Sequence, residues 1–322
     1  MNGKLFYRAE SYYFWKVPSR HPWLQDTRPS KASAEGLAVV KFSKLNDILK
    51  RCRRCDMKRV LTIAGSDCSG GAGIQADLKT FSAHGVFGMS VITAVTAQNT
   101  QGVFAVQDIS TEVIAKQIEA IFDDIEVDGV KIGMVSQVQT IEVIAERLRN
   151  YAPQTIVLDP VMVSKSGYHL LNPVAEATLI KELLPMSMIV TPNIPEAEVM
   201  TNRSIHTLKQ MEEGAKIIFQ MGAKNVLLKG GHLEEDSIDI LFDGEEFSYF
   251  SSSRITTKNT HGTGCTLSSA ISANLALGHS LNKAISLAKE YITIAIQNSL
   301  SIGKGVGPTH HFYTLYKKAG LI

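Results

Sequence analysis

The stretch Lys258-Asn-Thr-His-Gly-Thr-Gly-Cys-Thr-Leu-Ser-Ser-Ala270 predicts a short glycine-containing turn that runs directly into a helix. Beyond the turn, apolar residues recur every four positions at Leu267, Ile271 and Leu275, which places them on one helical face. The first N–H groups of such a helix have no partner within the helix, and the helix dipole adds positive potential there. The stretch therefore predicts an anion-binding site at the start of the helix.

Three residues at this turn point to chemistry rather than to a simple connection. Gly262 and Gly264 allow backbone conformations that are closed to other residues and leave room for a ligand. Cys265 lies at the mouth of the predicted site, where a helix N-terminus tends to lower the pKa of a thiol, so we expect it to act as a base or nucleophile. A glycine turn before a helix can also be purely structural, so the choice depends on the rest of the chain.

The composition indicates a globular protein with a large core. The chain has 322 residues, 44% hydrophobic and 20% charged, which allows one large α/β domain or two ordinary ones. A net charge of +2 argues against a nucleic-acid partner, and no apolar run approaches the ~18–20 residues of a membrane span. Four cysteines in a chain of this length form no disulfide framework, so we expect a reducing compartment and a cytoplasmic protein.

Residues 1–56 differ from the rest of the chain. They hold 12 Lys/Arg against 5 Asp/Glu, whereas residues 57–322 hold 21 against 26. They show no sustained hydrophobic period, and Cys52 and Cys55 have no second Cys/His pair nearby to complete a zinc site. We interpret residues 1–56 as a disordered extension, with a basic targeting presequence as the alternative, and expect the folded domain to span 57–322.

From Met57 onward, short apolar runs alternate with helical patterns. Alternation of this kind predicts a mostly parallel sheet covered by helices on both faces. The expected strands are 60–64, 90–97, 129–133, 155–159, 188–191 and 224–229, followed by a hairpin of 238–242 and 246–250. The expected helices are 74–84, 112–123, 138–149, 174–184, 205–221, 263–277 and 281–299.

Polar residues follow the predicted strands, and ligands of parallel sheets bind beyond the carboxyl ends of strands. The clusters are Ser66 with Asp67, Gln98 with Asn99, Asp159, Asn193 with Glu196, and Lys229. Because the ends of parallel strands meet at one edge of the sheet, the sequence predicts one shared cleft.

Each polar residue has a functional and a structural interpretation. Asp67 can accept a hydrogen bond from a ligand or act as a turn or cap residue, and the planar carboxamide of Gln98 suits the edge of a heteroaromatic ring. Glu196 can help to hold Mg²⁺ together with phosphate oxygens and water, or it is a favourable acid at a helix N-terminus. Lys229 can reach phosphate oxygens or be a solvated lysine at the end of a strand.

Taken together, these stretches resemble the ribokinase superfamily, and within it the hydroxymethylpyrimidine/phosphomethylpyrimidine kinases of thiamine biosynthesis. The likeness runs from about Lys58 to His311. The motifs that carry it are Ala64–Lys79, Thr96–Thr100, Lys131–Met134, Asp159–Met162, Thr191–Asn193 with Glu196, Lys229–His232 and His261–Cys265.

The resemblance implies a ribokinase-like three-layer α/β/α sandwich that forms a homodimer and transfers the γ-phosphate of ATP, with Mg²⁺, to the hydroxymethyl group of a small pyrimidine and then to the resulting monophosphate. It assigns residues to three groups. The pyrimidine side takes Gly65, Asp67, Ala72, Gln98, Met134 and Val161; the nucleotide side takes Asp159, Thr191, Asn193, Lys229, Gly262, Thr263 and Gly264; Cys265 is the base and Glu196 faces Mg²⁺.

Other functions remain open on the sequence. A pyridoxal kinase of the type that resembles these pyrimidine kinases also ends its anion hole in Gly-Cys, and a sugar kinase is disfavoured because Cys265 stands where sugar kinases carry Asp. A vitamin-precursor binding protein on an inactive kinase scaffold is the non-enzymatic alternative. Intact Glu196, Lys229 and Cys265 argue against it.

Overall fold

A nine-stranded sheet forms the centre of the protein in the computed structural model, which describes residues 57–162, 171–231 and 237–322. The strand order is β3-β2-β1-β4-β5-β6-β7-β8-β9, and the strands from β2 to β7 run parallel to one another. The strands are β1 (Arg59–Asp67), β2 (Phe87–Asn99), β3 (Gly102–Asp108), β4 (Gly129–Ile132), β5 (Ile156–Leu158), β6 (Ile189–Val190), β7 (Val226–Leu228), β8 (Ser237–Phe242) and β9 (Phe247–Ser252).

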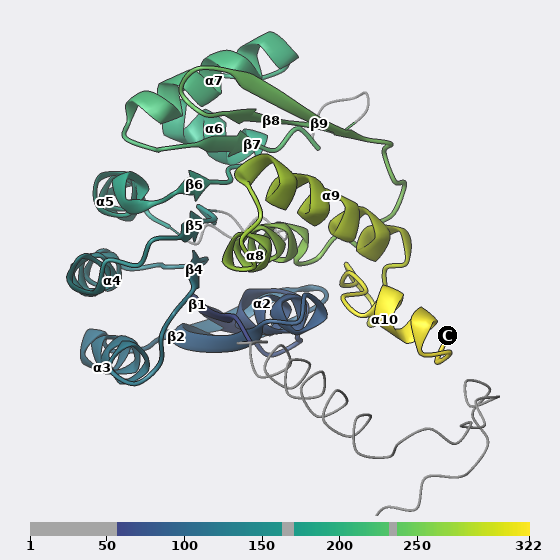
Figure 1. The fold of residues 1–322 in the computed structure, drawn as a ribbon, viewed down its shortest axis with the longest axis horizontal. Helices are drawn as coiled ribbons and strands as arrows, with labels where there is room; N and C mark the ends of the chain where they lie inside the picture. The colour runs from purple at the N-terminus through teal and green to yellow at the C-terminus, as the bar shows by residue number, and fades with distance from the viewer. Residues whose placement is uncertain (1–56, 163–170, 232–236) are drawn as a thin grey trace, which may run out of the picture. The chain divides into compact units, whose positions relative to one another are not determined.

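Helices cover both faces of the sheet (Figure 1), so the predicted three-layer α/β/α architecture is confirmed. Helices α3, α4 and α5 lie on one side of the strands in Figure 1, whereas α2, α8 and α9 lie on the other side. The helices are α2 (Gly73–Ala83), α3 (Thr111–Phe122), α4 (Val138–Tyr151), α5 (Pro173–Glu182), α6 (Ile194–Thr201), α7 (Leu208–Gln220), α8 (Thr263–Ala276), α9 (Leu281–Gln297) and α10 (Tyr313–Lys318), with a 3₁₀ turn at Leu184–Met186.

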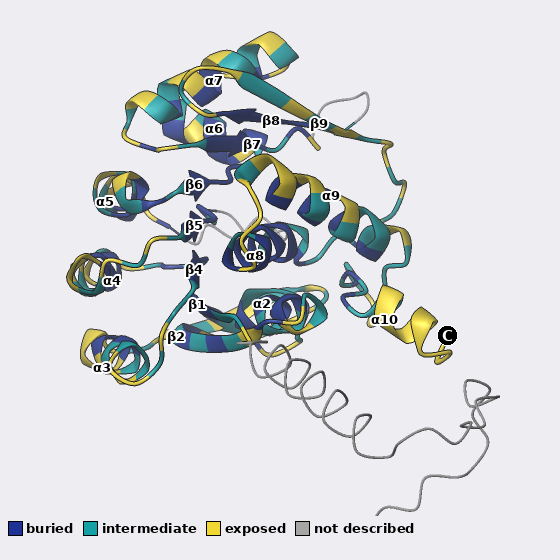
Figure 2. Ribbon diagram, viewed as in Figure 1, coloured by how far each residue is buried: buried dark blue, intermediate teal, exposed yellow. Residues whose placement is uncertain are grey.

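The sheet separates two main regions of hydrophobic core. One face packs against the apolar sides of α3 to α7, and the other packs against α8 and α9. The central strands are buried along their whole length because both of their faces are covered (Figure 2), as the continuous apolar runs predict.

Helix α8 is the most enclosed helix of the described chain. Ten of its 14 residues are buried, because it packs against the sheet as well as against α2 and α9. Its buried positions are mostly small residues, Ser268, Ser269, Ala270, Ser272 and Ala273 among them, which allow this close approach. The enclosure fixes the direction in which the N-terminus of α8 points.

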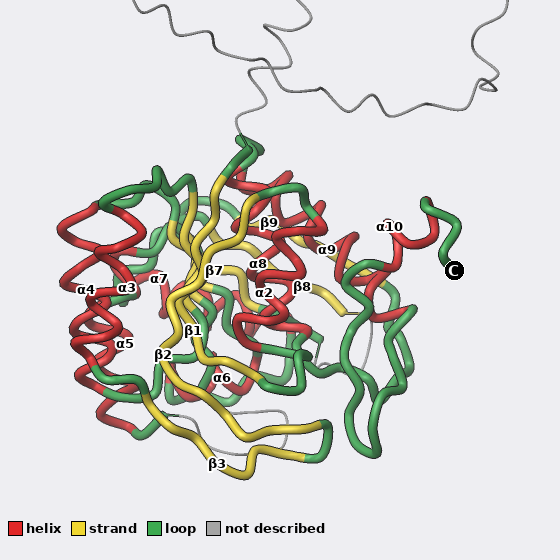
Figure 3. Tube along the Cα trace, turned by 90° about the horizontal axis from the view of Figure 1, so that it is seen from below, coloured by secondary structure: helices red, strands yellow, loops and turns green. Residues whose placement is uncertain are grey.

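Antiparallel strands close both edges of the sheet. The predicted hairpin is present as β8 and β9, turning at Asp243-Gly244, where Gly244 has a φ of +103°. At the other edge, β3 pairs with the long strand β2 in a hairpin that extends beyond the neighbouring strands (Figure 3). β3 was not predicted: residues 103–106 are apolar, but four of the seven residues of the strand are exposed, so it lacks the burial of the other strands.

Two boundary differences have local reasons, and two short helices were not predicted. β1 does not stop at Ala64, since it pairs with β2 as far as Asp67 after a register shift. α7 begins at Leu208 rather than at residue 205, because Thr207 and Gln210 form a capping box. The short helices α6 and α10 were not predicted, although Glu196 was interpreted as a possible acid at a helix N-terminus.

The predictions for residues 1–56, including those for Cys52 and Cys55, lie outside the described residues. The predicted domain boundary at Met57 therefore stays a prediction.

Within the described ranges, no helix has the length and hydrophobicity required to cross a membrane.

Candidate active site

A cleft of about 650 Å³ opens at the carboxyl ends of the parallel strands, where the sequence predicts it. It has two ends, which we name after their residues. The anion-hole end is formed by Gly262–Cys265 with Asp159 and Lys229, and the Gln98 end by Gly65, Gln98 and Met134. Of the predicted site residues, the cleft is lined by Gly65, Asp67, Ala72, Gln98, Met134, Asp159, Val161, Asn193, Glu196, Lys229, Gly262, Thr263, Gly264 and Cys265.

The N-terminus of α8 forms the wall of the anion-hole end. No side chain caps this helix, so its first amides are available to a ligand. Gly262 has a φ of +76°, and a Cβ atom there would lie 1.8 Å from the carbonyl oxygen of Gly71. Only glycine fits this position, and the geometry matches the requirements for binding an anion.

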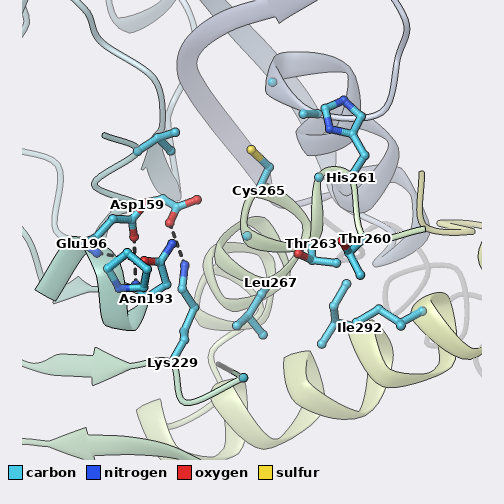
Figure 4. A pocket seen from close by; sticks show the side chains of 18 of the residues that line it. Asp159, Asn193, Glu196, Lys229, Thr260, His261, Thr263, Cys265, Leu267 and Ile292 are labelled. Atoms are coloured by element: carbon cyan, nitrogen blue, oxygen red, sulfur yellow. Dashed lines mark hydrogen bonds and ion pairs between the residues drawn. The ribbon is translucent and has the colours of Figure 1, made fainter. Parts of the chain in front are cut away.

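A buried ion pair faces the start of α8 (Figure 4). Lys229 Nζ lies 3.1 Å from Asp159 Oδ1, and Ser268 Oγ from α8 donates to Asp159 Oδ2 at 3.2 Å. Burial acts to raise the pKa of Asp159, but the ammonium groups of Lys229 and Lys131 more than offset it, so the pKa lies below its usual value. The pair therefore places an ammonium and a carboxylate together beside Gly264, and neither group is left uncompensated.

Thr191 does not lie in the wall of the cleft, contrary to its predicted place beside the nucleotide. It is fully buried, and its hydroxyl lies 3.2 Å from Asp159 Oδ1. Although β6 ends at Val190, the Thr191 amide still donates to the Leu158 carbonyl at 2.9 Å, which keeps Thr191 in the layer of the sheet. Thr191 supports Asp159, which itself reaches the cleft.

Asn193 and Glu196 form a capping box at the start of α6. The Asn193 side chain accepts from the Glu196 amide at 2.9 Å, and Glu196 Oε2 accepts from the Asn193 amide at 2.8 Å. Burial raises the pKa of Glu196 to about 7, opposed by Lys229 and reinforced by Asp159. Among the residues that the structure describes, no group of three or more His, Cys, Asp or Glu could hold a metal ion. Glu196 alone fits a cation whose other ligands are phosphate oxygens and water.

The expected low pKa of Cys265 is wrong for the free protein. Cys265 is half-buried at the anion-hole end, and burial raises the pKa of its thiol to about 11, although the ammonium of Lys131 acts in the opposite direction. The carboxylates of Asp77 and Asp159 raise the pKa of the thiol further. Cys265 is therefore a thiol at neutral pH.

The Gln98 end is shaped by close contacts. A Cβ atom at position 65 would lie 2.4 Å from Met134 Cε, so glycine lets the Met134 side chain lie over the end of β1. Thr96 Oγ1 lies 3.2 Å from Gln98 Oε1 and orients the carboxamide. The exposed thiol of Cys68 contacts the backbone of Gln98, with Sγ 3.0 Å from the carbonyl oxygen.

In the structure, Asp67 acts as a turn residue, which is one of the two roles that the sequence allowed. Its carboxylate accepts hydrogen bonds from the amides of Ser69, Gly71 and Ala72 at 2.8, 3.1 and 2.8 Å. Its Oδ2 also lies 2.8 Å from His261 Nε2, which is 3.2 Å from Gln98 Nε2. Burial acts to raise the pKa of Asp67, but the hydrogen bonds from His261 and Ser69 hold it below its usual range.

The sequence analysis did not give His261 a role. This residue connects the two ends of the cleft, because it precedes Gly262 and contacts both Asp67 and Gln98. Its place directly before the first glycine of the turn was the signal in the sequence.

A second buried ion pair, between Lys131 and Asp77, was also not predicted. Both side chains are fully buried, and Lys131 Nζ lies 3.0 Å from Asp77 Oδ2. Ser269 Oγ from α8 donates to Asp77 Oδ1 at 2.7 Å.

A cleft that offers helix amides and a lysine at one end, and a polar carboxamide in a narrow pocket at the other, suits the transfer of a phosphate to a small planar molecule. The fold and the site together define a small-molecule kinase of the α/β class. A family model described as phosphomethylpyrimidine kinase matches residues 67–310, and the chain belongs to this family.

Individual relatives agree with this assignment. The hydroxymethylpyrimidine/phosphomethylpyrimidine kinase of Rhizobium meliloti is 53% identical over 261 residues, which is 80% of this chain and 98% of that protein. A crystal structure of phosphomethylpyrimidine kinase from Clostridium difficile is 54% identical with a TM-score of 0.68, covering 74% of this chain and 99% of that one. The ADP complex of Bacillus subtilis pyridoxal kinase is 41% identical with a TM-score of 0.76, covering 81% and 99%.

Proposed function

We propose that the protein transfers the γ-phosphate of ATP to the hydroxymethyl group of 4-amino-5-hydroxymethyl-2-methylpyrimidine, and then phosphorylates the monophosphate to the diphosphate, as part of thiamine biosynthesis. The observation that carries this proposal is the presence of the anion-hole end and the Gln98 end in one cleft. The similarity to the hydroxymethylpyrimidine/phosphomethylpyrimidine kinase of Rhizobium meliloti supports it.

In this proposal the anion-hole end binds the phosphate that is transferred. Phosphoryl transfer depends mainly on positioning and on electrostatic stabilisation of the equatorial oxygens. The uncapped amides of Gly264 and Cys265 supply fixed dipoles, and Lys229 supplies a positive charge held in place by Asp159. Because the same dipoles favour any anion, an acceptor that already carries a phosphate is tolerated there.

Cys265 is proposed to receive the proton of the acceptor hydroxyl. Since its thiol has a pKa of about 11, only a small fraction is thiolate at neutral pH. A largely dissociative transition state makes this acceptable, because the acceptor then needs orientation more than early deprotonation. Only the thiolate can accept that proton, so this minor form of Cys265 is the reactive one, while the thiol form orients the hydroxyl at the start of α8.

Glu196 is the residue proposed to face Mg²⁺, which when bound would neutralise charge between the phosphates. Asn193 fixes the Glu196 carboxylate through the capping box. A homodimer and a cytoplasmic location are proposed on the family resemblance and the cysteine content alone.

The test is a time course with purified protein, ATP, Mg²⁺ and the unphosphorylated pyrimidine. Monophosphate is expected to accumulate first and then to give way to diphosphate. A reaction that stops at monophosphate, with added monophosphate also inert, would reject the second step.

A parallel panel with pyridoxal and ribose tests the acceptor. The similarity to Bacillus subtilis pyridoxal kinase makes pyridoxal the informative competitor. Turnover that favours pyridoxal over the pyrimidine would replace the proposed substrate while leaving the kinase class intact.

A further inference from the structure

The loop between α9 and α10 contacts two segments that lie far apart in the sequence. Its central part is Ser301-Ile-Gly-Lys-Gly-Val-Gly307, which contains three glycines in five residues. On one side it binds the turn between β2 and β3: the Gly305 amide donates to Thr100 Oγ1 at 3.1 Å, and the Val306 amide donates to the Thr100 carbonyl at 2.8 Å. Thr100 lies two residues beyond Gln98.

On its other side the loop binds the segment that leads into α8. The Gly307 amide donates to Asn259 Oδ1 at 3.0 Å, and Asn259 Nδ2 donates to Ser301 Oγ at 3.0 Å. The His261 amide donates to the Gly307 carbonyl at 3.1 Å. Asn259 is buried and lies three residues before Gly262, so this contact leads directly to the anion-hole end.

The three glycines are required by contacts rather than by flexibility. A Cβ atom on Gly303, where φ is +77°, would lie 2.5 Å from Thr100 Oγ1, and one on Gly305 would lie 2.0 Å from the Thr100 carbonyl oxygen. A Cβ atom on Gly307 would lie 2.1 Å from the Leu300 carbonyl oxygen and 2.7 Å from Asn259 Oδ1. The loop therefore fits closely against both anchors, although Ser301 to Lys304 are exposed on its outer side.

We propose that residues 301–307 form a connector that sets the separation between Gln98 and the anion hole, with Thr100 and Asn259 as positioning residues for phosphoryl transfer. The proposal rests on the proposed kinase function. A connector of this kind matters because the acceptor oxygen and the phosphate must be held in near-attack geometry, where a displacement of about 1 Å can cost ~10²-fold in rate.

The first test compares Thr100→Val with Thr100→Ser. Valine keeps the shape but removes the acceptor of the Gly305 amide, whereas serine keeps the hydroxyl. Thr100→Val is expected to raise KM for the pyrimidine and lower kcat, together about tenfold in kcat/KM, with little change in KM for ATP. Thr100→Ser is expected to stay close to the unaltered protein.

Thr207→Val is the matched control. Thr207 also accepts a hydrogen bond from a backbone amide, that of Gln210 at 3.3 Å, but it caps α7 and does not line the cleft. This variant is expected to lower Tm without changing kcat/KM. If Thr100→Val lowers Tm in the same way and leaves both kinetic constants unchanged, the connector proposal is wrong.

The second test concerns the other anchor and uses two variants. Asn259→Ala removes both contacts, and Ser301→Ala removes only the bond from Asn259 Nδ2 at an exposed residue that tolerates substitution. Both are expected to weaken the binding of ADP measured by calorimetry without acceptor, Asn259→Ala about tenfold and Ser301→Ala less. Unchanged ADP affinity in Ser301→Ala together with unchanged kinetics would reject a connecting role at this anchor.

Combining Thr100→Val with Ser301→Ala tests whether the anchors act through one connector. If the two anchors are coupled, the fold loss of kcat/KM in the double variant is smaller than the product of the two single losses. If they are independent, the fold loss equals that product. Strict independence rejects the connector. If the substrate panel shows another acceptor, the same variants are measured with that acceptor, so a failure of the proposed substrate is distinguishable from a failure of the connector.

Discussion

The two ends of the cleft are built from different parts of the protein. At the anion-hole end, binding groups are backbone amides of an enclosed helix and one buried ion pair, Lys229 with Asp159. At the Gln98 end, they are side chains at the end of β2 and in the turn before α8, with Gln98 and His261 oriented by Thr96 and Asp67. This difference suggests that rate depends on the first end and acceptor choice on the second, and each prediction below tests that division.

The largest loss is expected from Lys229→Met. Removing the ammonium should lower kcat/KM by ~10²–10³-fold, the usual range for one group that stabilises transition-state charge. It also leaves Asp159 buried without its partner, which should cost about 3–5 kcal/mol in the free energy of unfolding. Kinetic assays and chemical denaturation measure the two effects.

A double variant separates these effects. Lys229→Met with Asp159→Asn removes the uncompensated charge, so it should recover stability but not activity. Recovery of activity together with stability would assign the Lys229 charge a structural role only.

Cys265→Ala is expected to lower kcat by ~10²-fold while ATP still binds. The pH dependence of kcat tests whether Cys265 acts as a base. Since burial raises the thiol pKa to about 11, the thiolate fraction rises with pH throughout the range below it. A required thiolate therefore predicts that kcat increases from pH 7 to pH 9, and a flat profile with intact Cys265 would limit the residue to orienting the hydroxyl.

Acid is expected to destabilise the anion-hole end through His311. Its Nε2 lies 3.1 Å from the hydroxyl of Thr266 in α8, and burial lowers its pKa from 6.5 to about 4. The unfolded chain then binds a proton that the folded protein does not, so this stability is present above pH 6.5 and is lost as pH falls towards 4. The loss approaches about 3 kcal/mol.

The measurement is the free energy of unfolding against pH for the protein and for His311→Gln. The difference between the two curves should change between pH 6.5 and pH 4 and be constant above that window. A constant difference throughout would mean that His311 does not titrate differently on folding.

At the Gln98 end, Gln98→Met should act on acceptor binding. Loss of the carboxamide is expected to raise KM for the pyrimidine about tenfold, the equivalent of one net hydrogen bond, with little change in KM for ATP or in kcat. Gln107→Met on the exposed strand β3 is the control and should change none of these constants. A fall in kcat with unchanged acceptor KM would contradict the division between the ends.

The smallest effect is expected from removing residues 1–56. Every described residue that lines the cleft lies between Gly65 and Ile296, within the predicted domain 57–322. A chain that starts at Met57 should keep its Tm and its kcat/KM, measured beside the full-length protein. Insoluble or inactive protein would show that the extension belongs to the folded domain.

Sequence reasoning succeeded where the signal is local. The run 156–158 is apolar and continuous, and the glycines before α8 define a turn, so the parallel sheet and the turn that leads into α8 could be predicted. Contacts between distant segments carry no such signal: the support of Asp159 by Thr191 and of Gln98 by His261 appears only in three dimensions.

The pKa of Cys265 shows the same limit. Its position at a helix start is readable from the sequence, whereas the hydration it loses depends on the elements packed around it. The local pattern therefore singled out Cys265 but predicted a lowered pKa, whereas the pKa is raised.

The enclosure of α8 has a consequence for how the sequence can change over time. Ser268, Ser269, Ala270, Ser272 and Ala273 are all completely buried, so a larger side chain at any of them would push the helix off the sheet and carry its N-terminus with it. The outer surfaces of α3 to α5 face no such constraint. Tolerated mutations in this protein should therefore concentrate on those surfaces, and the small residues of α8 should be the least replaceable part of the chain.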